Sequence, residues 1–239
     1  MKALLLRVGI DKGSDGILGP IFSDGSFEYI PISETDKNSC ETHTYTNTKG
    51  QSGHYLSYYL SDKIQNKKIH FDPEFETYTY GDIKTKAKYL TKLRKDDLLV
   101  FYAGLKPYNH DNYPEALYII GYFTVENIID FKTLEKKDQE LYSKIYSNNA
   151  HIKRSNLEED LVIAVGDPAR SRLMDRALLI SNKKLDKRGR PYNVVSKYME
   201  RLLGIKGSIQ RSIPPRIIKD EKIDNLKKLL KLNSRSNKF

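Results

Sequence analysis

Two apolar, aromatic-rich segments at residues 98–103 and 116–125 constrain the fold of this chain most strongly. Each has the length and composition of a buried strand, and a loop rich in Pro, Asn and His at 106–114 separates them. A helix is expected just before them, over about 82–93, because apolar residues there recur on one face with lysines opposite. This order of elements predicts a sheet flanked by helices.

The remaining elements are predicted from shorter patterns. Asp24-Gly25 is a strong signal for a two-residue hairpin turn. Residues 33–56 are polar without periodicity and predict a long loop, either mobile or closing on a ligand. Further strands are expected at 2–10, 18–22, 26–32, 70–75, 160–165 and 173–180, and helices at 131–147, 192–203 and 219–232. We expect a single α+β domain over residues 1–218, with a mostly antiparallel sheet or partly closed barrel, followed by a basic helix or tail at 219–239.

Composition excludes several classes of protein. With 38% hydrophobic and 30% charged residues among 239, the chain is long enough and apolar enough to bury a core. Cys40 is the single cysteine, so neither an intrachain disulfide nor a thiolate metal cluster forms within the chain. No apolar run approaches the ~20 residues of a membrane span, and residues 2–10 predict a strand rather than a signal peptide. The cytoplasm is the expected compartment.

The positive charge is concentrated at one end of the chain. Residues 181–239 hold 17 Lys and Arg against 5 Asp and Glu, a net charge of +12, whereas the preceding 180 residues hold 24 against 26. Such an asymmetry is typical of proteins that bind a polyanion, and nucleic acid is the commonest one inside cells. A lysine-rich solvated surface is the alternative. Removal of the chain after residue 218 is expected to weaken DNA binding and leave a folded domain.

Five polar residues form the candidate site, with catalytic roles assigned to Asp11, His70 and Asp72. Arg7 and Ser14 are candidates for binding phosphate, since a guanidinium matches phosphate and the glycines around Ser14 let backbone N–H groups approach an anion. His70 and Asp72 are two apart on an extended segment and therefore face the same side, as an acid–base pair or as metal ligands. We expect alanine at Asp11 or at His70 to abolish function with little loss of thermal stability.

Structural roles explain the same residues equally well. Arg7 and Asp11 pair with one another in this alternative, Asp72 caps the turn at Pro73, and His70 satisfies a buried carbonyl. The other histidines show no spacing typical of zinc ligands, so no metal site is predicted, and no cofactor motif is present.

Arginines in the C-terminal part are candidates for contacts with a nucleic-acid backbone: Arg170, Arg172, Arg188, Arg190 and Arg211. Lys187-Arg-Gly-Arg-Pro resembles the core of an AT-hook, in which two arginines around a glycine lie along an A·T minor groove. Asp186–Gly189 is equally well suited to a hairpin turn, so both interpretations remain open.

Four segments together resemble the third family of nucleotide modification associated domains. They are Arg7-Val-Gly-Ile-Asp through Gly-Pro-Ile-Phe-Ser-Asp-Gly25, Ile69-His-Phe-Asp-Pro-Glu-Phe75, Asp97-Leu-Leu-Val-Phe-Tyr-Ala-Gly104 and Ile120-Gly-Tyr-Phe-Thr-Val125. The resemblance covers about residues 1–130, with a looser match in the C-terminal part. It departs from the pattern at Ile10, where an aromatic is usual, and at Tyr102-Ala-Gly104, where the strand often ends in aromatics. It implies a role in DNA base modification and names no reaction.

Residues 82–128 also resemble the middle of PUA-like domains of the EVE and ASCH type. The order of a helix, a charged turn, a strand, a loop and a strand with Ile-x-Gly-x-x-x-Val carries this resemblance. It implies a small barrel that binds RNA or unusual bases in a cleft, although an antiparallel meander with a glycine bulge at Gly121 gives the same pattern.

Three functions follow as hypotheses. The first is a nucleic-acid-directed protein, with DNA preferred over RNA as its partner, that is associated with base modification or recognises modified bases. The second is an enzyme that cleaves or modifies a base or strand through His70 and Asp72. The third is an accessory interaction module without a catalytic site.

Overall fold

The two apolar segments form the longest strands of the protein. In the computed structural model, which describes residues 1–211 and 213–232, β6 (Leu98–Pro107) pairs antiparallel with β7 (Ala116–Asp130). Both strands are buried over most of their length, as expected for strands covered on two faces. The predicted strand pair is confirmed.

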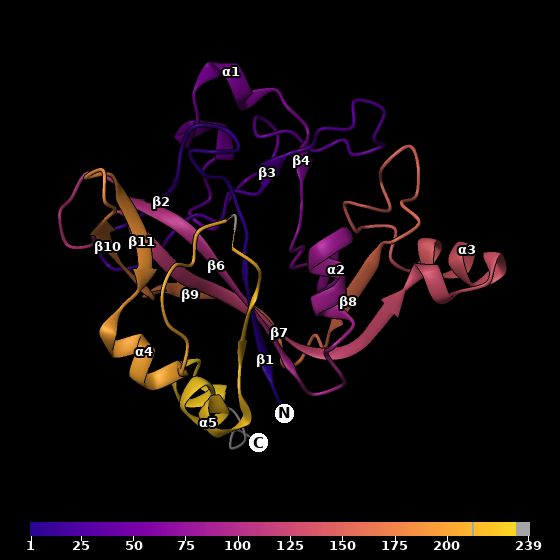
Figure 1. Cartoon of the computed structure of the whole chain (residues 1–239). Coiled ribbons are helices and arrows are strands. Elements are labelled where there is room, and N and C mark those ends of the chain that lie inside the picture. The colour runs from indigo at the N-terminus through magenta and orange to yellow at the C-terminus, as the bar shows by residue number, and fades with distance from the viewer. Residues whose placement is uncertain (212, 233–239) are drawn as a thin grey trace, which may run out of the picture.

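Among the described residues, seventeen further helices and strands surround this pair (Figure 1). The helices are η1 (Leu56–Tyr59), α1 (Asp62–Gln65), α2 (Lys84–Leu90), η2 (Phe131–Thr133), α3 (Lys136–Ile145), α4 (Lys197–Leu203) and α5 (Asp220–Leu229). The strands are β1 (Ala3–Arg7), β2 (Gly19–Ile21), β3 (Ile32–Ser33), β4 (Ile69–His70), β5 (Thr79–Asp82), β8 (Val162–Gly166), β9 (Arg172–Leu179), β10 (Ser181–Leu185), β11 (Pro191–Val195) and β12 (Arg216–Ile218). In the described part of the chain, no helix has the length and apolar character needed to cross a membrane.

Eight strands form one sheet in the order β12-β1-β6-β7-β8-β5, with β2 beside β6 and β9 beside β7. β1 and β2 run parallel to β6, and the other pairs in this sheet are antiparallel. The α+β class and the mostly antiparallel sheet are therefore confirmed. The sheet does not close on itself, since β12 and β5 lie at its two ends, so the described strands form no barrel.

A glycine bulge interrupts β7. The pairing of β7 with β9 shifts register between Ile119 and Gly121. A Cβ at Gly121 would lie 2.9 Å from both the Arg172 carbonyl oxygen and the Phe75 ring, so only glycine allows β9 and Phe75 to approach this closely.

Residues 192–203 do not form the single helix that their amphipathic pattern predicts. Tyr192–Val195 belong to β11, which pairs with β10, and α4 begins only after Ser196. The Ser196 hydroxyl accepts a hydrogen bond from the Met199 N–H at 3.2 Å, so it caps the helix there. The valines at 194 and 195 favour a strand over helix, and the turn at 186–189 places this strand beside β10. The hairpin interpretation of residues 186–189 is therefore confirmed.

The C-terminal helix belongs to the same core as the sheet. Ile223, Leu226 and Leu230 are at most 4% exposed and pack in the main hydrophobic cluster. β12 pairs with β1 directly before this helix. A boundary after residue 218 would therefore divide one core, and truncation there would expose apolar side chains of the rest of the domain.

The polar segment 33–56 packs against the domain. Tyr45 is fully buried in it, and its hydroxyl donates to the Pro31 carbonyl oxygen at 2.9 Å. Backbone bridges join Thr44 to Lys68 and Lys49 to Tyr55. This segment lies with β3, β4 and α1 above the sheet in Figure 1, whereas α4 and α5 lie below it.

Candidate functional site

The segment between β4 and β5 carries the predicted His70 and Asp72. β4 ends at His70 and pairs with β3, which fixes the direction of the His70 side chain. Asp72 follows two residues later, and its Oδ1 accepts a hydrogen bond from the Gly81 N–H of β5 at 2.8 Å. The His70 Nε2 and the Asp72 Oδ2 lie 4.0 Å apart, in agreement with the prediction that the two side chains face the same side of the segment.

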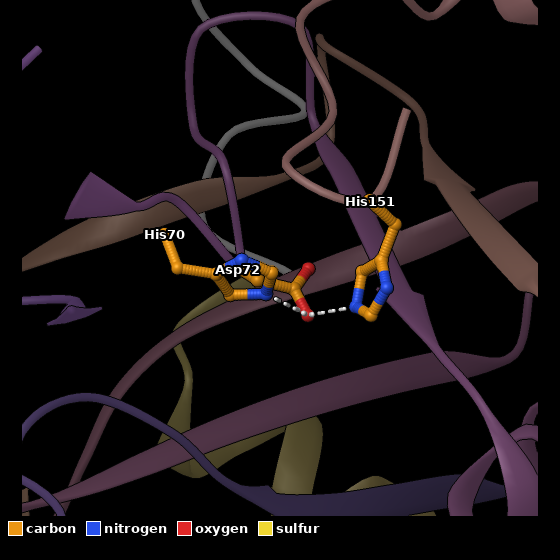
Figure 2. A group of neighbouring side chains, drawn as sticks. All are labelled: His70, Asp72 and His151. Carbon is orange, nitrogen blue, oxygen red and sulfur yellow. Dashed lines mark ion pairs between the residues drawn. The ribbon is translucent and has the colours of Figure 1, made fainter. Parts of the chain in front are cut away.

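A second histidine approaches the same carboxylate from a distant part of the chain. The His151 Nε2 lies 3.7 Å from the Asp72 Oδ2, so both imidazoles face a single oxygen (Figure 2). The two rings meet edge to face with centroids 4.9 Å apart. His70 and His151 are 4% and 5% exposed. Gly81 makes room for this approach, because a Cβ there would lie 2.8 Å from the His151 ring.

Each imidazole is held from behind by a carboxylate. The His70 Nδ1 contacts the Glu34 Oε2 at 2.6 Å, and the His151 Nδ1 contacts the Glu158 Oε2 at the same distance. Arg154 joins these two carboxylates, since its Nη2 lies 3.2 Å from Glu34 and its Nη1 2.9 Å from Glu158. Together these contacts fix both rings so that each Nε2 faces Asp72.

Neighbouring carboxylates, imidazoles and the Arg154 guanidinium shift the pKa values in this cluster. Burial disfavours the charged form of His151, but the carboxylates of Asp72 and Glu158 outweigh it and raise the pKa of His151 to about 9. Burial alone would raise the pKa of Glu34, yet its hydrogen bonds from His70 and Arg154 hold that pKa well below its ordinary value. The hydrogen bond from His151 lowers the pKa of Glu158.

Arg7, Asp11 and Ser14 meet in a different place, together with Arg211. The Asp11 Oδ2 accepts from the Arg211 Nε at 2.5 Å and lies 3.6 Å from the Arg7 Nη2. Its Oδ1 accepts from the N–H groups of Gly13 and Ser14 at 2.8 and 2.9 Å. Burial and the neighbouring Arg211 charge lower the pKa of Arg7 to about 10.

These residues line a cavity of about 430 Å³, which His70 and Asp72 do not line. Tyr29 lies between the two groups: its ring lies against Gly9, and its hydroxyl donates to the Pro73 carbonyl oxygen at 3.3 Å. The five residues expected in one pocket thus belong to two neighbouring polar clusters.

Most of the predicted backbone-binding arginines are engaged within the protein. Arg170 forms ion pairs with Asp96 and Asp167, both at 2.6 Å. Arg172 donates to the Leu230 carbonyl oxygen, and its guanidinium lies over the Tyr122 ring. Arg190 pairs with Asp186 across the tip of the β10–β11 hairpin, where Arg188 is exposed. The AT-hook-like residues therefore form a hairpin turn, and groove binding by them stays a prediction.

A larger cavity of about 600 Å³ lies beside the His70–Asp72–His151 cluster. Phe71 and Pro73, the neighbours of Asp72 in sequence, line one part of it, and Asn148 and Lys153 from the loop that carries His151 line another. Tyr29 and Phe75 add two more aromatic rings. The cavity is thus bounded by the two segments that position the cluster, although His70, Asp72 and His151 themselves are not among the residues that line it.

A family model described as nucleotide modification associated domain 3 matches residues 2–211. The chain belongs to this family. The match extends well beyond the first 130 residues that carry the sequence resemblance, and it includes both polar clusters and both cavities. No curated protein and no solved structure is significantly similar to the chain.

In this nucleotide modification associated domain, sequence patterns missed His151, Glu34, Glu158 and Arg154. These residues come from distant segments, so no local spacing connects them to His70 and Asp72. Also missed was a surface hollow of about 790 Å³ between α4 and α5, lined by four cations and by Glu200, which forms an ion pair with Lys197 at 3.0 Å. The four cations are Lys197, Arg201, Lys206 and Lys222.

Proposed function

We propose that this protein recognises a nucleotide base in nucleic acid as part of a nucleotide modification system, with the base held in the cavity of about 600 Å³. The observation that carries this proposal is the lining of the cavity. Tyr29, Phe71 and Phe75 supply aromatic surface on which a base stacks. Asn47, Gln51 and Asn148 supply amide groups of the kind that read the edges of bases.

The basic hollow between α4 and α5 supports nucleic acid as the partner. Its four cations lie in the region that carries the net charge of +12, two of them belong to α4, and they outnumber the one carboxylate in the lining, Glu200. Lysine and arginine side chains on one surface bind the phosphate backbone without regard to sequence. This proposal includes DNA rather than RNA as the partner and the cytoplasm as the compartment. It also includes a distant relation to PUA-like domains.

A second candidate function is enzymatic cleavage or modification of the base or the strand. The observation that favours it is the convergence of His70, Asp72 and His151 on segments whose neighbouring residues line the cavity. Analysis of the nucleic acid by mass spectrometry after incubation tests it, since a changed base or a shortened strand is expected only from an enzyme.

Phe71→Ala is expected to weaken base binding by about 1–3 kcal/mol, because base stacking on an aromatic side chain contributes this much. Phe71 is half-buried at the cavity, so its truncation leaves most of the core intact. Isothermal titration with deoxynucleoside monophosphates and short single-stranded DNA, carrying unmodified or 5-substituted pyrimidines, measures the change. Tyr142→Ala on α3 is the matched control, a half-buried aromatic outside the cavity. Equal affinities in the wild type and Phe71→Ala would exclude this cavity as the base site.

Replacing Lys197, Arg201, Lys206 and Lys222 together with Gln is expected to reduce the salt dependence of DNA binding. Each lost phosphate contact lowers the slope of log K against log salt by about 0.9. Side-chain substitution is used because truncation after residue 218 removes part of the core. The control carries the same charge change on another surface: Lys132, Lys136, Lys137 and Lys144 to Gln. A slope that is the same in both quadruple variants would place the backbone contact elsewhere.

A further inference from the structure

We infer that His70, Asp72 and His151 bind one divalent transition-metal ion. One ligand atom from each residue lies within 4.8 Å of the others, and Figure 2 shows both imidazoles turned toward the same carboxylate oxygen. This inference goes beyond the proposed base recognition, and its test uses metal alone.

The distances within the cluster leave room for an ion between the side chains. The two Nε2 atoms lie 4.0 and 3.7 Å from the Asp72 Oδ2, which exceeds the length of a direct hydrogen bond. In a tetrahedral site with metal–ligand bonds of 2.0–2.1 Å, ligand atoms are roughly 3.3 Å apart. Side-chain rotations that bring these atoms closer by roughly 1 Å therefore complete such a site.

Contacts behind the ligands match those of protein metal sites. A metal-binding histidine donates its second ring N–H to a carboxylate, which fixes the tautomer and directs the other nitrogen at the ion. Glu34 and Glu158 provide this contact at 2.6 Å for His70 and His151, respectively. Arg154 binds both glutamates, so the two imidazoles are positioned by one connected network.

The charge of the cluster also favours a divalent cation. Glu34, Asp72 and Glu158 carry three negative charges, and Arg154 offsets one of them. Histidine binds metals as the neutral imidazole, so an ion displaces the proton that the raised pKa of His151 keeps at neutral pH, and with both imidazoles neutral the net formal charge is −2. One divalent ion balances this charge in a setting where an unbalanced charge is costly.

The donor set selects the kind of ion. Two imidazole nitrogens and one carboxylate oxygen suit Zn²⁺, Fe²⁺ and Co²⁺, whereas Mg²⁺ and Ca²⁺ favour oxygen ligands throughout. Three protein ligands leave at least one coordination position for water or another small ligand.

Metal titration of the EDTA-treated, dialysed full-length protein tests the inference. We expect one equivalent of Zn²⁺, Co²⁺ or anaerobic Fe²⁺ to bind, with visible absorption bands from bound Co²⁺ and a raised melting temperature. Mg²⁺ is expected to have no such effect. Failure of all three transition metals to bind with one-to-one stoichiometry would overturn the inference, whatever the behaviour of any variant.

Variants identify the ligands. Asp72→Asn and His151→Ala are expected to abolish the Co²⁺ spectrum, and Glu158→Gln to weaken binding about 10- to 100-fold. Asp72→Asn retains an oxygen for the Gly81 N–H, so it remains informative if His151→Ala does not fold. His54→Ala, a change at an exposed histidine, is expected to bind as the wild type does. An unchanged Co²⁺ spectrum in folded Asp72→Asn would assign the metal to another site and overturn the inference.

Discussion

Asp11→Ala is expected to lower the free energy of unfolding by about 3 kcal/mol, because it leaves a buried arginine without its counter-charge. Asp11 accepts from Arg211 and from two backbone N–H groups, and it is the acidic neighbour of Arg7. Among the described residues, Arg7 already has a buried Nε without a hydrogen-bond partner. These contacts revise the expectation that Asp11 can be replaced at little cost to stability.

Chemical denaturation at neutral pH measures this change, with Asp111→Ala in an exposed loop as the control. A loss below about 0.5 kcal/mol would show that Asp11 does not stabilise the folded chain, since surface substitutions stay within about that range. Retained stability together with lost nucleotide binding would support the original expectation of a ligand-binding role.

The stabilisation by Asp11 is also expected to depend on pH. Burial alone would raise the pKa of Asp11, but the hydrogen bond and charge of Arg211 and the charge of Arg7 lower it below the ordinary value of 3.8. The ionised carboxylate is therefore fully stabilising above that ordinary value, and its contribution is lost as the pH falls through the lowered pKa. The difference in stability between the wild type and Asp11→Ala should be constant near neutrality and shrink in acid.

Glu28→Ala is expected to cost about 3 kcal/mol or more, and to abolish binding in the cavity of about 600 Å³. Glu28 is fully buried, and its two carboxylate oxygens accept from the N–H groups of Gln51 and Ser52 at 2.8 and 2.5 Å. Gly50 lies so close that a Cβ there would overlap the carboxylate. Loss of Glu28 therefore strands two backbone donors and releases the cavity wall around residues 47–51.

Denaturation and isothermal titration measure the two effects separately. Glu28→Gln tests the two hydrogen bonds more directly, because it keeps the size of the side chain. Its amide oxygen still accepts from one backbone N–H, but its NH₂ group faces the other backbone N–H, to which it cannot bond. Its stability should lie at or slightly above that of Glu28→Ala. Glu140→Ala, at an exposed position on α3, is the control. Wild-type stability in Glu28→Ala would mean that the wall is held by its other contacts.

Local patterns in the sequence predicted the central elements correctly. The apolar runs of β6 and β7 and the amphipathic α2 formed where expected. The chain also turns at Asp24-Gly25, but three residues rather than two separate the paired Phe22 and Ser26, and a single bridge from Ile21 to Phe27 replaces the expected strand. Each depends on burial or backbone preferences within a few residues. The pattern failed at 192–203, where a strand and a capped helix share one apolar periodicity.

In the candidate site too, sequence spacing predicted the contacts between residues close in sequence and missed those between distant segments. Asp11, Gly13 and Ser14 form one turn, and His70 faces Asp72 across a single intervening residue, so sequence spacing was sufficient to group them. The partners that complete each group come from distant segments. Arg211 lies 200 residues from Asp11 along the chain. His151, in the segment between α3 and β8, contacts Asp72 in the segment between β4 and β5.

The sequence by itself determined the fold class, the buried strands, the concentration of basic charge and the family context, because these depend on composition and on short-range periodicity. Only the tertiary structure decided that the arginine–aspartate group lines a cavity to which the histidine–aspartate group does not contribute. It also decided that Glu34, Glu158 and Arg154 orient the two histidines. The physical reason is that side chains converge through strand order and loop packing, which no spacing along the chain encodes.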